Sequence, residues 1–126
     1  MYQSLEIFRT AAQMAKHAGA RQAVTARNIA NADTPGYRAF HMPEFKEVAG
    51  TNTASSMRAT RQGHLGTEAT SFAAKLTPST VEASPNGNAV SLEEEMMRSV
   101  EIGREHSRAL AVYRHAMTVI QSSIGR

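Results

Sequence analysis

The residue types that most often carry chemistry are spaced in this chain in a way that argues against catalysis. The five histidines are His17, His41, His64, His106 and His115, and there is no cysteine. No two histidines lie four residues apart, the spacing that places two metal ligands on one face of a helix. The sequence also lacks a glycine-rich phosphate loop and a nucleophile elbow. We therefore expect no catalytic residues, no metal and no cofactor, and we expect that the protein is not an enzyme.

The densest acidic group is the triplet Glu93–Glu95, which follows Ser91. A serine followed three residues later by a glutamate, here Glu94, is the signature of a capping box, and the helix dipole favours carboxylates in a first turn. The triplet is therefore interpreted as a helix start rather than as a catalytic pair. His106 lies on the apolar side of the same predicted helix, where we expect a buried polar residue that sets register rather than a base.

The basic residues are not gathered into a patch of the kind that binds nucleic acid. The net charge is +3, and eleven of the fourteen basic residues are arginine, a residue suited to bidentate pairing at interfaces. The predicted helices carry charges of both signs, and no nucleic-acid-binding motif is present. We therefore expect no nucleic-acid partner.

No part of the chain has the pattern of a membrane or signal segment. No apolar run approaches the ~18 residues that a membrane-spanning helix needs. Residues 1–20 have no continuous apolar core, because polar and charged residues interrupt them at Glu6, Arg9, Gln13, Lys16 and His17. We expect no direct membrane insertion and no cleaved signal peptide, which by itself suggests a cytoplasmic protein.

Residues 3–32 have the pattern of one long amphipathic helix. Small and apolar side chains recur at steps of three and four, at Leu5, Phe8, Ala12, Ala15, Gly19, Gln22, Ala26 and Ile29. A second stripe lies beside the first and comprises Ile7, Ala11, Met14 and Ala18. This spacing is the helical period. Because many of these residues are alanine, the face is shallow and permits another helix to approach closely.

Residues 91–124 repeat the pattern with larger side chains. A heptad seam runs through Leu92, Met96, Ser99, Gly103, His106, Leu110, Tyr113, Met117, Ile120 and Ile124. A helix of this extent would be about 50 Å long. That length is unusual in a globular domain and indicates a coiled coil or a filament.

The distribution of charge favours antiparallel pairing of the two helices. In that arrangement the expected ion pairs are Arg27 with Glu94–Glu95, Arg21 with Glu101, and Glu6 with Arg114. Such surface pairs add little stability, but their common sign selects an orientation. We predict a mainly α protein in which two long terminal helices form an antiparallel, coiled-coil-like hairpin.

The middle of the chain, residues 38–90, is rich in Ala, Ser, Thr, Gly and Asn. A connection this long is unusual in a compact domain, so we expect a largely irregular region. Short pieces, Phe40 to Val48 and Phe72 to Leu76, are candidates for packing on the helices or forming small strands. Asn86-Gly87 is a candidate tight turn. We treat residues 1–126 as one domain.

The segment from Asn28 to Tyr37 marks the end of the first helix. Pro35 disfavours the α region for Thr34, so the helix must stop here. Pro35-Gly36 suits the centre of a type II turn, where the second residue needs a positive φ. The Asn and Asp side chains can bond to nearby backbone groups, and Tyr37 supplies an apolar anchor with a polar tip.

The order Asn-Ile-Ala-Asn-x-x-Thr-Pro-Gly-Tyr in this segment resembles the N-terminal signature of bacterial flagellar rod, hook and hook-associated proteins. Ala20-Arg21-Gln22 and Phe45 agree with that family at the expected distances. Thr60 with His64-Leu65, and the run from Asn86 to Met96, resemble motifs of a proximal rod protein of the flagellar basal body. The short middle region argues against the distal rod and hook proteins, which carry extra domains there. A sister proximal rod protein, or another helical self-assembling interaction protein, is the alternative.

The resemblance implies a structural, polymer-forming subunit of the flagellar basal body rod, which is needed for motility. It implies that the chain is exported into the periplasmic rod by the flagellar type III apparatus without a cleaved signal peptide. The partners that it implies are copies of the same chain, other rod proteins, the rod-base adaptor, the MS ring and the flagellar export gate.

The residues on which this function is expected to depend are structural and form two groups. The turn group comprises Asn28, Asn31, Thr34, Pro35, Gly36 and Tyr37. The group that we call the assembly seam comprises Leu5, Phe8, Ile29, Leu92, Met96, Leu110, Tyr113, Met117, Ile120 and Ile124. The sequence leaves two roles open for the seam residues, contact with a neighbouring subunit or contact with the other helix of the same chain.

Overall fold

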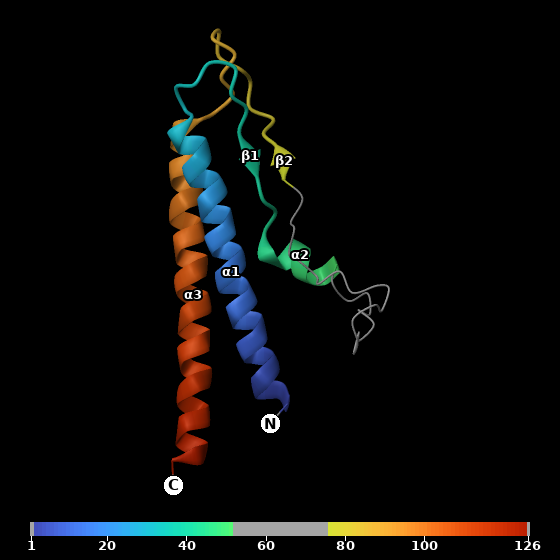
Figure 1. Ribbon diagram of the computed structural model, residues 1–126, viewed down its shortest axis with the longest axis vertical. Helices are drawn as coiled ribbons and strands as arrows, with labels where there is room; N and C mark the ends of the chain where they lie inside the picture. The colour runs from blue at the N-terminus through green and yellow to red at the C-terminus, as the bar shows by residue number, and fades with distance from the viewer. Residues whose placement is uncertain (1, 52–75, 126) are drawn as a thin grey trace, which may run out of the picture.

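The computed structural model describes residues 2–51 and 76–125 and shows a long helical hairpin. Helix α1, Tyr2–Ala30, and helix α3, Leu92–Ile124, lie side by side and run in opposite directions, so that both chain ends lie at one end of the hairpin (Figure 1). The predicted mainly α hairpin is confirmed. Helix α1 ends two residues before its predicted end.

Small side chains fill the interface between the two helices. On α1 the buried residues include Ala11, Ala18 and Thr25, and on α3 they are Glu95, Ile102 and Ala109. Each set recurs every seven residues, the repeat of a coiled-coil seam. Alanine at these positions lets the two backbones approach closely, but each one buries little apolar surface.

On each helix, the residues that face the other helix lie one position before the most regular apolar stripe of the sequence. Ala12, Gly19 and Ala26 are exposed beside the buried positions on α1. Met96, Gly103 and Leu110 are likewise exposed on α3. The stripe with the largest side chains was therefore not the one that the chain buries against itself. Large residues in the interface would hold the helices apart, whereas the neighbouring stripe of small residues permits close packing.

The ends of both long helices lie close to where their sequences predict them. The Ser91 side chain accepts a hydrogen bond from the Glu94 backbone N–H at 3.4 Å, which caps the first turn of α3. The Glu94 carboxylate lies 3.9 Å from Arg98, and within the described residues it makes no return bond to Ser91. The serine half of the predicted capping box is thus present. Helix α1 ends in tight turns in which Asn31 and Ala32 donate backbone bonds to the last carbonyls.

Short elements of the middle region lie along one side of α1 (Figure 1). Strand β1, Phe40–His41, pairs antiparallel with β2, Thr77–Pro78. Helix α2, Phe45–Thr51, packs on α1 through Phe45, whose ring lies 5.7 Å from that of His17 in an edge-to-face contact. The predicted piece from Phe40 to Val48 thus contains a strand and a short helix. Most of the piece from Phe72 to Leu76, and the motif residues Thr60, His64 and Leu65, lie outside the described residues.

None of the described helices is both long enough and apolar enough to cross a bilayer.

Candidate functional site: the signature turn and the exposed helix faces

The signature segment forms the predicted turn. The Tyr37 backbone N–H donates to the Thr34 carbonyl at 3.2 Å, and Gly36 has a φ of +71°. A bond from the fourth residue to the first, with a positive φ at the third, is the geometry of a type II turn. Within the same turn, the Thr34 hydroxyl donates to the Asn31 side-chain oxygen at 3.2 Å.

A second loop packs against this turn. The Gly87 N–H donates to the Ser84 carbonyl at 2.8 Å, and Gly87 has a φ of +79°. The loop continues to the signature turn through the Gly36 N–H, which donates to the Asn86 carbonyl at 3.2 Å. A Cβ atom placed on Gly87 would lie 3.4 Å from the Gly36 Cα. The two glycines therefore allow the backbones of distant segments to meet, and the candidate Asn86-Gly87 turn is present.

Asn88 joins the two loops, although the sequence gave no separate role to its side chain. It is buried, and its amide nitrogen donates to the carbonyls of Asn31 at 3.0 Å and Thr34 at 2.7 Å. Its side-chain oxygen accepts from the Val90 N–H at 2.8 Å. Asn88 thus fixes the segment before α3 to two carbonyls of the turns that follow α1. Its place in the family-like run from Asn86 to Met96 is the sequence signal that marked it.

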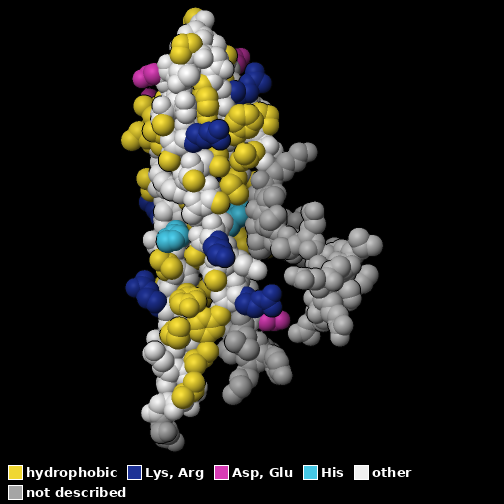
Figure 2. Space-filling model, viewed as in Figure 1, with side chains coloured by type: hydrophobic (Ala, Val, Ile, Leu, Met, Phe, Trp, Pro, Cys, Tyr) yellow, Lys and Arg dark blue, Asp and Glu magenta, His cyan; other side chains and the backbone are white. Residues whose placement is uncertain are grey.

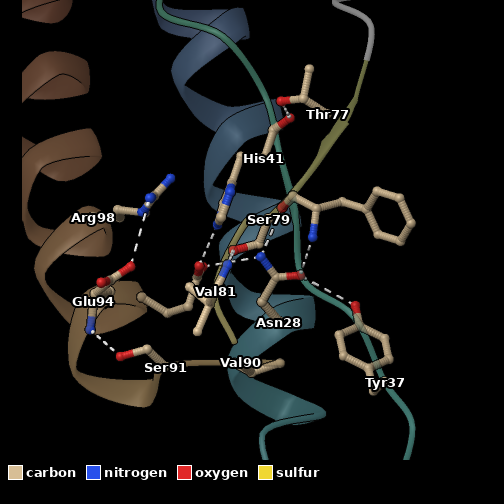
Figure 3. Close-up of polar contacts among 12 residues, drawn as sticks. Asn28, Tyr37, His41, Thr77, Ser79, Val81, Val90, Ser91, Glu94 and Arg98 are labelled. Carbon is tan, nitrogen blue, oxygen red and sulfur yellow. Dashed lines mark hydrogen bonds and ion pairs between the residues drawn. The ribbon is translucent and has the colours of Figure 1, made fainter. Parts of the chain in front are cut away.

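Asn28, the first residue of the signature, is fully buried and makes four hydrogen bonds (Figure 3). Its side-chain nitrogen donates to the Phe40 carbonyl at 2.8 Å and to the Glu95 carboxylate at 3.0 Å. Its side-chain oxygen accepts from the Phe40 N–H at 3.3 Å and from the Tyr37 hydroxyl at 3.2 Å. Every donor and acceptor position that faces these segments is used, so Asn28 connects α1, α3 and strand β1.

Glu95 is the buried acidic residue of this site. Its second carboxylate oxygen lies 2.6 Å from Nε2 of His41, and the residue is 2% exposed. Both oxygens are occupied by protein groups, so the carboxylate has a structural role. Sequence reasoning assigned all three glutamates of the triplet to the helix start. The sequence signal for its burial is the heptad repeat in which Glu95, Ile102 and Ala109 follow one another at steps of seven residues.

His17 is buried without a hydrogen-bond partner on either ring nitrogen. It faces Phe45 of α2, and Arg21 and Glu105 act on it electrostatically. The pKa of His17 is lowered, first by burial and then by the Arg21 guanidinium, and Glu105 opposes this shift. Since a protonated imidazole would have no partner here, the neutral form is favoured. His106, expected to be a buried register residue, is only half-buried.

One ion pair between the helices confirms their orientation and corrects the predicted partner. Arg21 contacts Glu105 at 2.6 Å rather than Glu101, which lies one turn earlier on α3. Close by, the Gln22 amide donates to the Ser99 hydroxyl at 2.7 Å. Within the described residues, Arg27 and Glu6 form no ion pair with the partners predicted for them. Their place at the surface, where water solvates the charges, accounts for this.

Most of the assembly-seam side chains that the structure describes are exposed. Those of α3 are Leu92 at 45%, Met96 at 57%, Leu110 at 40%, Tyr113 and Met117 at 37% and Ile124 at 75% exposure, while Phe8, Ile29 and Ile120 are half-buried. Phe8 also contacts Tyr113 edge-to-face at 5.1 Å between ring centres. Leu5 lies in α1, where the structure does not describe its side chain. Hydrophobic side chains run along much of the face shown in Figure 2.

A shallow apolar groove lies between the helices beside their buried seam. Its lining residues are Ala18, Gly19, Gln22, Ala23, Ala26, Ile102, Gly103 and His106. The predicted stripe positions Gly19, Ala26 and Gly103 thus border a surface groove rather than the closed interface. No group of three or more His, Asp or Glu side chains suited to a metal ion occurs among the described residues.

The chain is similar in sequence to known proteins. Residues 8–38, which cover most of α1 and the signature turn, match the family model described as "Flagella basal body rod protein". The chain is also 34% identical over 109 residues to the flagellar basal body rod protein FlgB of Agrobacterium fabrum, a match that covers 82% of this chain and 81% of the relative.

The chain belongs to the family of flagellar basal body rod proteins. Within that family it is FlgB-like, as the motifs of its middle and C-terminal regions predict. This is a family of structural proteins of the flagellar basal body and not an enzyme family.

Proposed function

We propose that the chain is a polymer-forming subunit of the proximal rod, the base of the drive shaft that carries torque outward from the membrane-embedded ring. The observation that carries the proposal is the contrast between the two kinds of helix surface. Among the described residues, the apolar side chains buried between the two helices are three alanines and Ile102, whereas the larger side chains Met96, Met97 and Ile124 are 57%, 68% and 75% exposed.

Exposed apolar side chains on this scale need a partner. Monomeric proteins seldom leave large contiguous apolar patches in water, and such patches mark interaction surfaces. On this chain they extend over both long helices, from Ile7 on α1 to Val119 and Ile124 near the end of α3. A surface that differs from the one it binds produces head-to-tail contacts, which generate a helical filament when they do not close into a ring.

We propose that copies of this chain and other rod proteins contact these faces through layered helix packing. The rod-base adaptor, the MS ring and the flagellar export gate are the further proposed partners at the base of the rod. The chain would reach this periplasmic position through the flagellar type III apparatus without a cleaved signal peptide. Family membership supports this set of partners and this route.

Gene deletion in the native bacterium tests the proposed function. Without a proximal rod subunit, no rod, hook or filament can be built on the basal rings, so the cells should be non-motile and lack external flagella. Electron microscopy and soft-agar swimming are the measurements. Normal swimming by the deletion strain would refute the proposal.

A paired substitution near the end of α3 tests the exposed surface itself. Ile120→Asp with Ile124→Asp places two charges on the apolar face and should abolish motility, because a desolvated carboxylate at an interface is strongly unfavourable. The control is Gln121→Asp with Ser122→Asp, which adds the same charge at exposed polar positions of the same turns. Immunoblots should show both proteins at wild-type levels. Equal motility of the two strains would exclude this face as an assembly surface.

A further inference from the structure

The connection between the two long helices does not determine how they align. Antiparallel helices joined by a short loop are held in register by that loop. Here α1 ends at Ala30 and α3 begins at Leu92, so the chain between them is residues 31–91. The cost of closing a loop grows slowly with its length, and a slip of one heptad changes that cost little. Contacts that bridge the two helices must therefore select the register, both in the interface and where Asn88 bonds to the carbonyls of Asn31 and Thr34.

The apolar part of the interface selects it weakly. Among the described residues, the buried apolar positions of the two helices are Ala11 and Ala18 on α1 and Ile102 and Ala109 on α3. If α3 slips by seven residues, small or aliphatic side chains again face one another at most of these positions. Small residues fit many partners, so a slipped pair would lose little packing.

Among the described residues, three polar pairs cross the interface, and they differ in burial. The Arg21–Glu105 pair leaves 13% and 33% of its side chains exposed, so water can solvate both groups after a slip. The Gln22–Ser99 bond is also only part-buried. The pair formed by Asn28 and Glu95 is closed to water, with exposures of 0% and 2%.

We propose that Glu95 determines the register of the α1–α3 pair, because its buried carboxylate is satisfied in one alignment only. In that alignment it accepts from Asn28 at 3.0 Å and contacts His41 at 2.6 Å. In any other alignment it is a buried charge that has lost its partners, or it must leave the interface. A single polar residue at a buried heptad position fixes the alignment of coiled coils in the same way.

The same carboxylate links the register to the order of the segment after the signature turn. Asn28, which Glu95 orients, binds both backbone groups of Phe40 and the Tyr37 hydroxyl. His41 follows Phe40 and reaches Glu95 directly. Strand β1, which also pairs with β2, is therefore fixed against both long helices when α1 and α3 are aligned. Because these contacts lie within one chain, the assignment of Glu95 holds or fails independently of the proposed role in the rod.

Thiol cross-linking of the full chain measures the register directly. The natural sequence has no cysteine, so introduced pairs report without background. Gln22→Cys with Ser99→Cys reports the native alignment. Gln22→Cys with Leu92→Cys, or with His106→Cys, reports a slip of seven residues in either direction, which moves the target about 10 Å along α3. The shortest bis-methanethiosulfonate reagent serves as the cross-linker.

Glu95→Leu should raise the ratio of slipped to native cross-links at least about tenfold, because it removes the charge that penalises other alignments. The matched control is Glu94→Leu, which removes an exposed carboxylate from the adjacent position and should leave the ratio unchanged. An unchanged ratio in the Glu95→Leu chain would overturn the assignment.

A charge-exchange experiment decides the question if the Glu95→Leu chain fails to fold. The substitution Asn28→Asp places a second carboxylate opposite that of Glu95. Because the two like charges repel in the native alignment, the native cross-link should be lost. Adding Glu95→Gln returns an amide opposite the new carboxylate, so the native cross-link should recover at least in part. Adding Glu94→Gln instead should restore nothing. Equal cross-linking in the two double variants would show that Asn28 and Glu95 are not coupled and would overturn the assignment.

Discussion

Asn28, Asn88 and Glu95 hold together segments that have almost no hydrophobic core between them. Each is at least 97% buried, and each satisfies groups from parts of the chain that are far apart in sequence. A buried polar group that loses its partner is costly, whereas a satisfied one specifies a single arrangement. In this chain, specificity comes largely from a few amides and one carboxylate, while alanines supply close contact.

His17 gives the folded chain a predictable dependence on pH. Burial and Arg21 lower its pKa below the value of 6.5 expected in the unfolded chain, with Glu105 opposing the shift. The unfolded chain therefore binds the proton more readily. The His17 contribution to stability is complete above pH 6.5 and decreases as the pH falls below that value. Acid should shift the chain away from the packed hairpin.

The measurement for His17 is far-UV circular dichroism in a trimethylamine N-oxide titration, since this osmolyte favours the folded state. Between a pH of about 7.5 and about 5.5, the natural chain should need more osmolyte to fold at the lower pH. His17→Leu should weaken that dependence, whereas His115→Leu, a change at an exposed histidine, should preserve it. The same pH response in the natural chain and in His17→Leu would contradict the prediction.

At the scale of secondary-structure elements, Gly19 and Gly36 respond in opposite ways to replacement by alanine. A Cβ atom at Gly19 or at Gly36 would meet nothing within 4 Å, so neither position is crowded. Gly19 lies within α1, where alanine stabilises a helix by about 1 kcal/mol relative to glycine. Gly36 has a φ of +71°, a conformation that costs other residues roughly 1–2 kcal/mol.

The two alanine substitutions should therefore change stability in opposite directions. Gly19→Ala should lower the osmolyte midpoint of folding and Gly36→Ala should raise it, each by an amount that corresponds to about 1 kcal/mol. Each variant is the control for the other, because the added methyl group is the same and neither clashes. A shift in the same direction for both would show that φ at residue 36 does not limit the turn.

The helices and the signature turn could be predicted because their signals are local. Periodicity, the Ser91 cap and the Pro35-Gly36 pair act over a few residues. The face that the helices share could not be predicted, because α1 has two adjacent stripes of small and apolar side chains and the buried stripe of α3 includes the charged residue Glu95. Hydrophobicity favoured the stripe through Met96 and Leu110, whereas close packing selected the stripe of small residues.

The polar network was missed for a related reason. Glu95 has the properties of a first-turn residue in the sequence, and only the approach of α1 and β1 shows that it is buried. Asn28 was identified as a turn residue, but its bonds to Glu95 and Phe40 depend on long-range contacts. The shift of the Arg21 partner from Glu101 to Glu105 has the same origin, since a long side chain can reach the next turn of a facing helix.

At the scale of the whole molecule, the buried apolar side chains and the exposed ones are unequal in size. Among the described residues, the buried apolar set is five alanines and Ile102, whereas methionine, leucine, valine and tyrosine side chains remain exposed along α3. Burying an alanine removes little apolar area from water, and ordering the backbone costs roughly 1–2 kcal/mol per residue. A chain with this balance gains most of its stabilisation when its outer faces are covered.

We therefore predict that the free subunit is only partly helical and that its helices complete when subunits associate. In dilute solution, far-UV circular dichroism should give less helix than the 29-residue α1 and the 33-residue α3 would contribute, with a broad thermal transition. Helical signal should rise with protein concentration, because association stabilises the folded form by mass action.

The chain with Ile120→Asp and Ile124→Asp should lose this concentration dependence, since its outer face resists burial, while Gln121→Asp with Ser122→Asp should retain it. Full helicity and a cooperative transition of the dilute natural chain would show that the alanine interface and the polar network suffice, and that assembly joins subunits that have already folded.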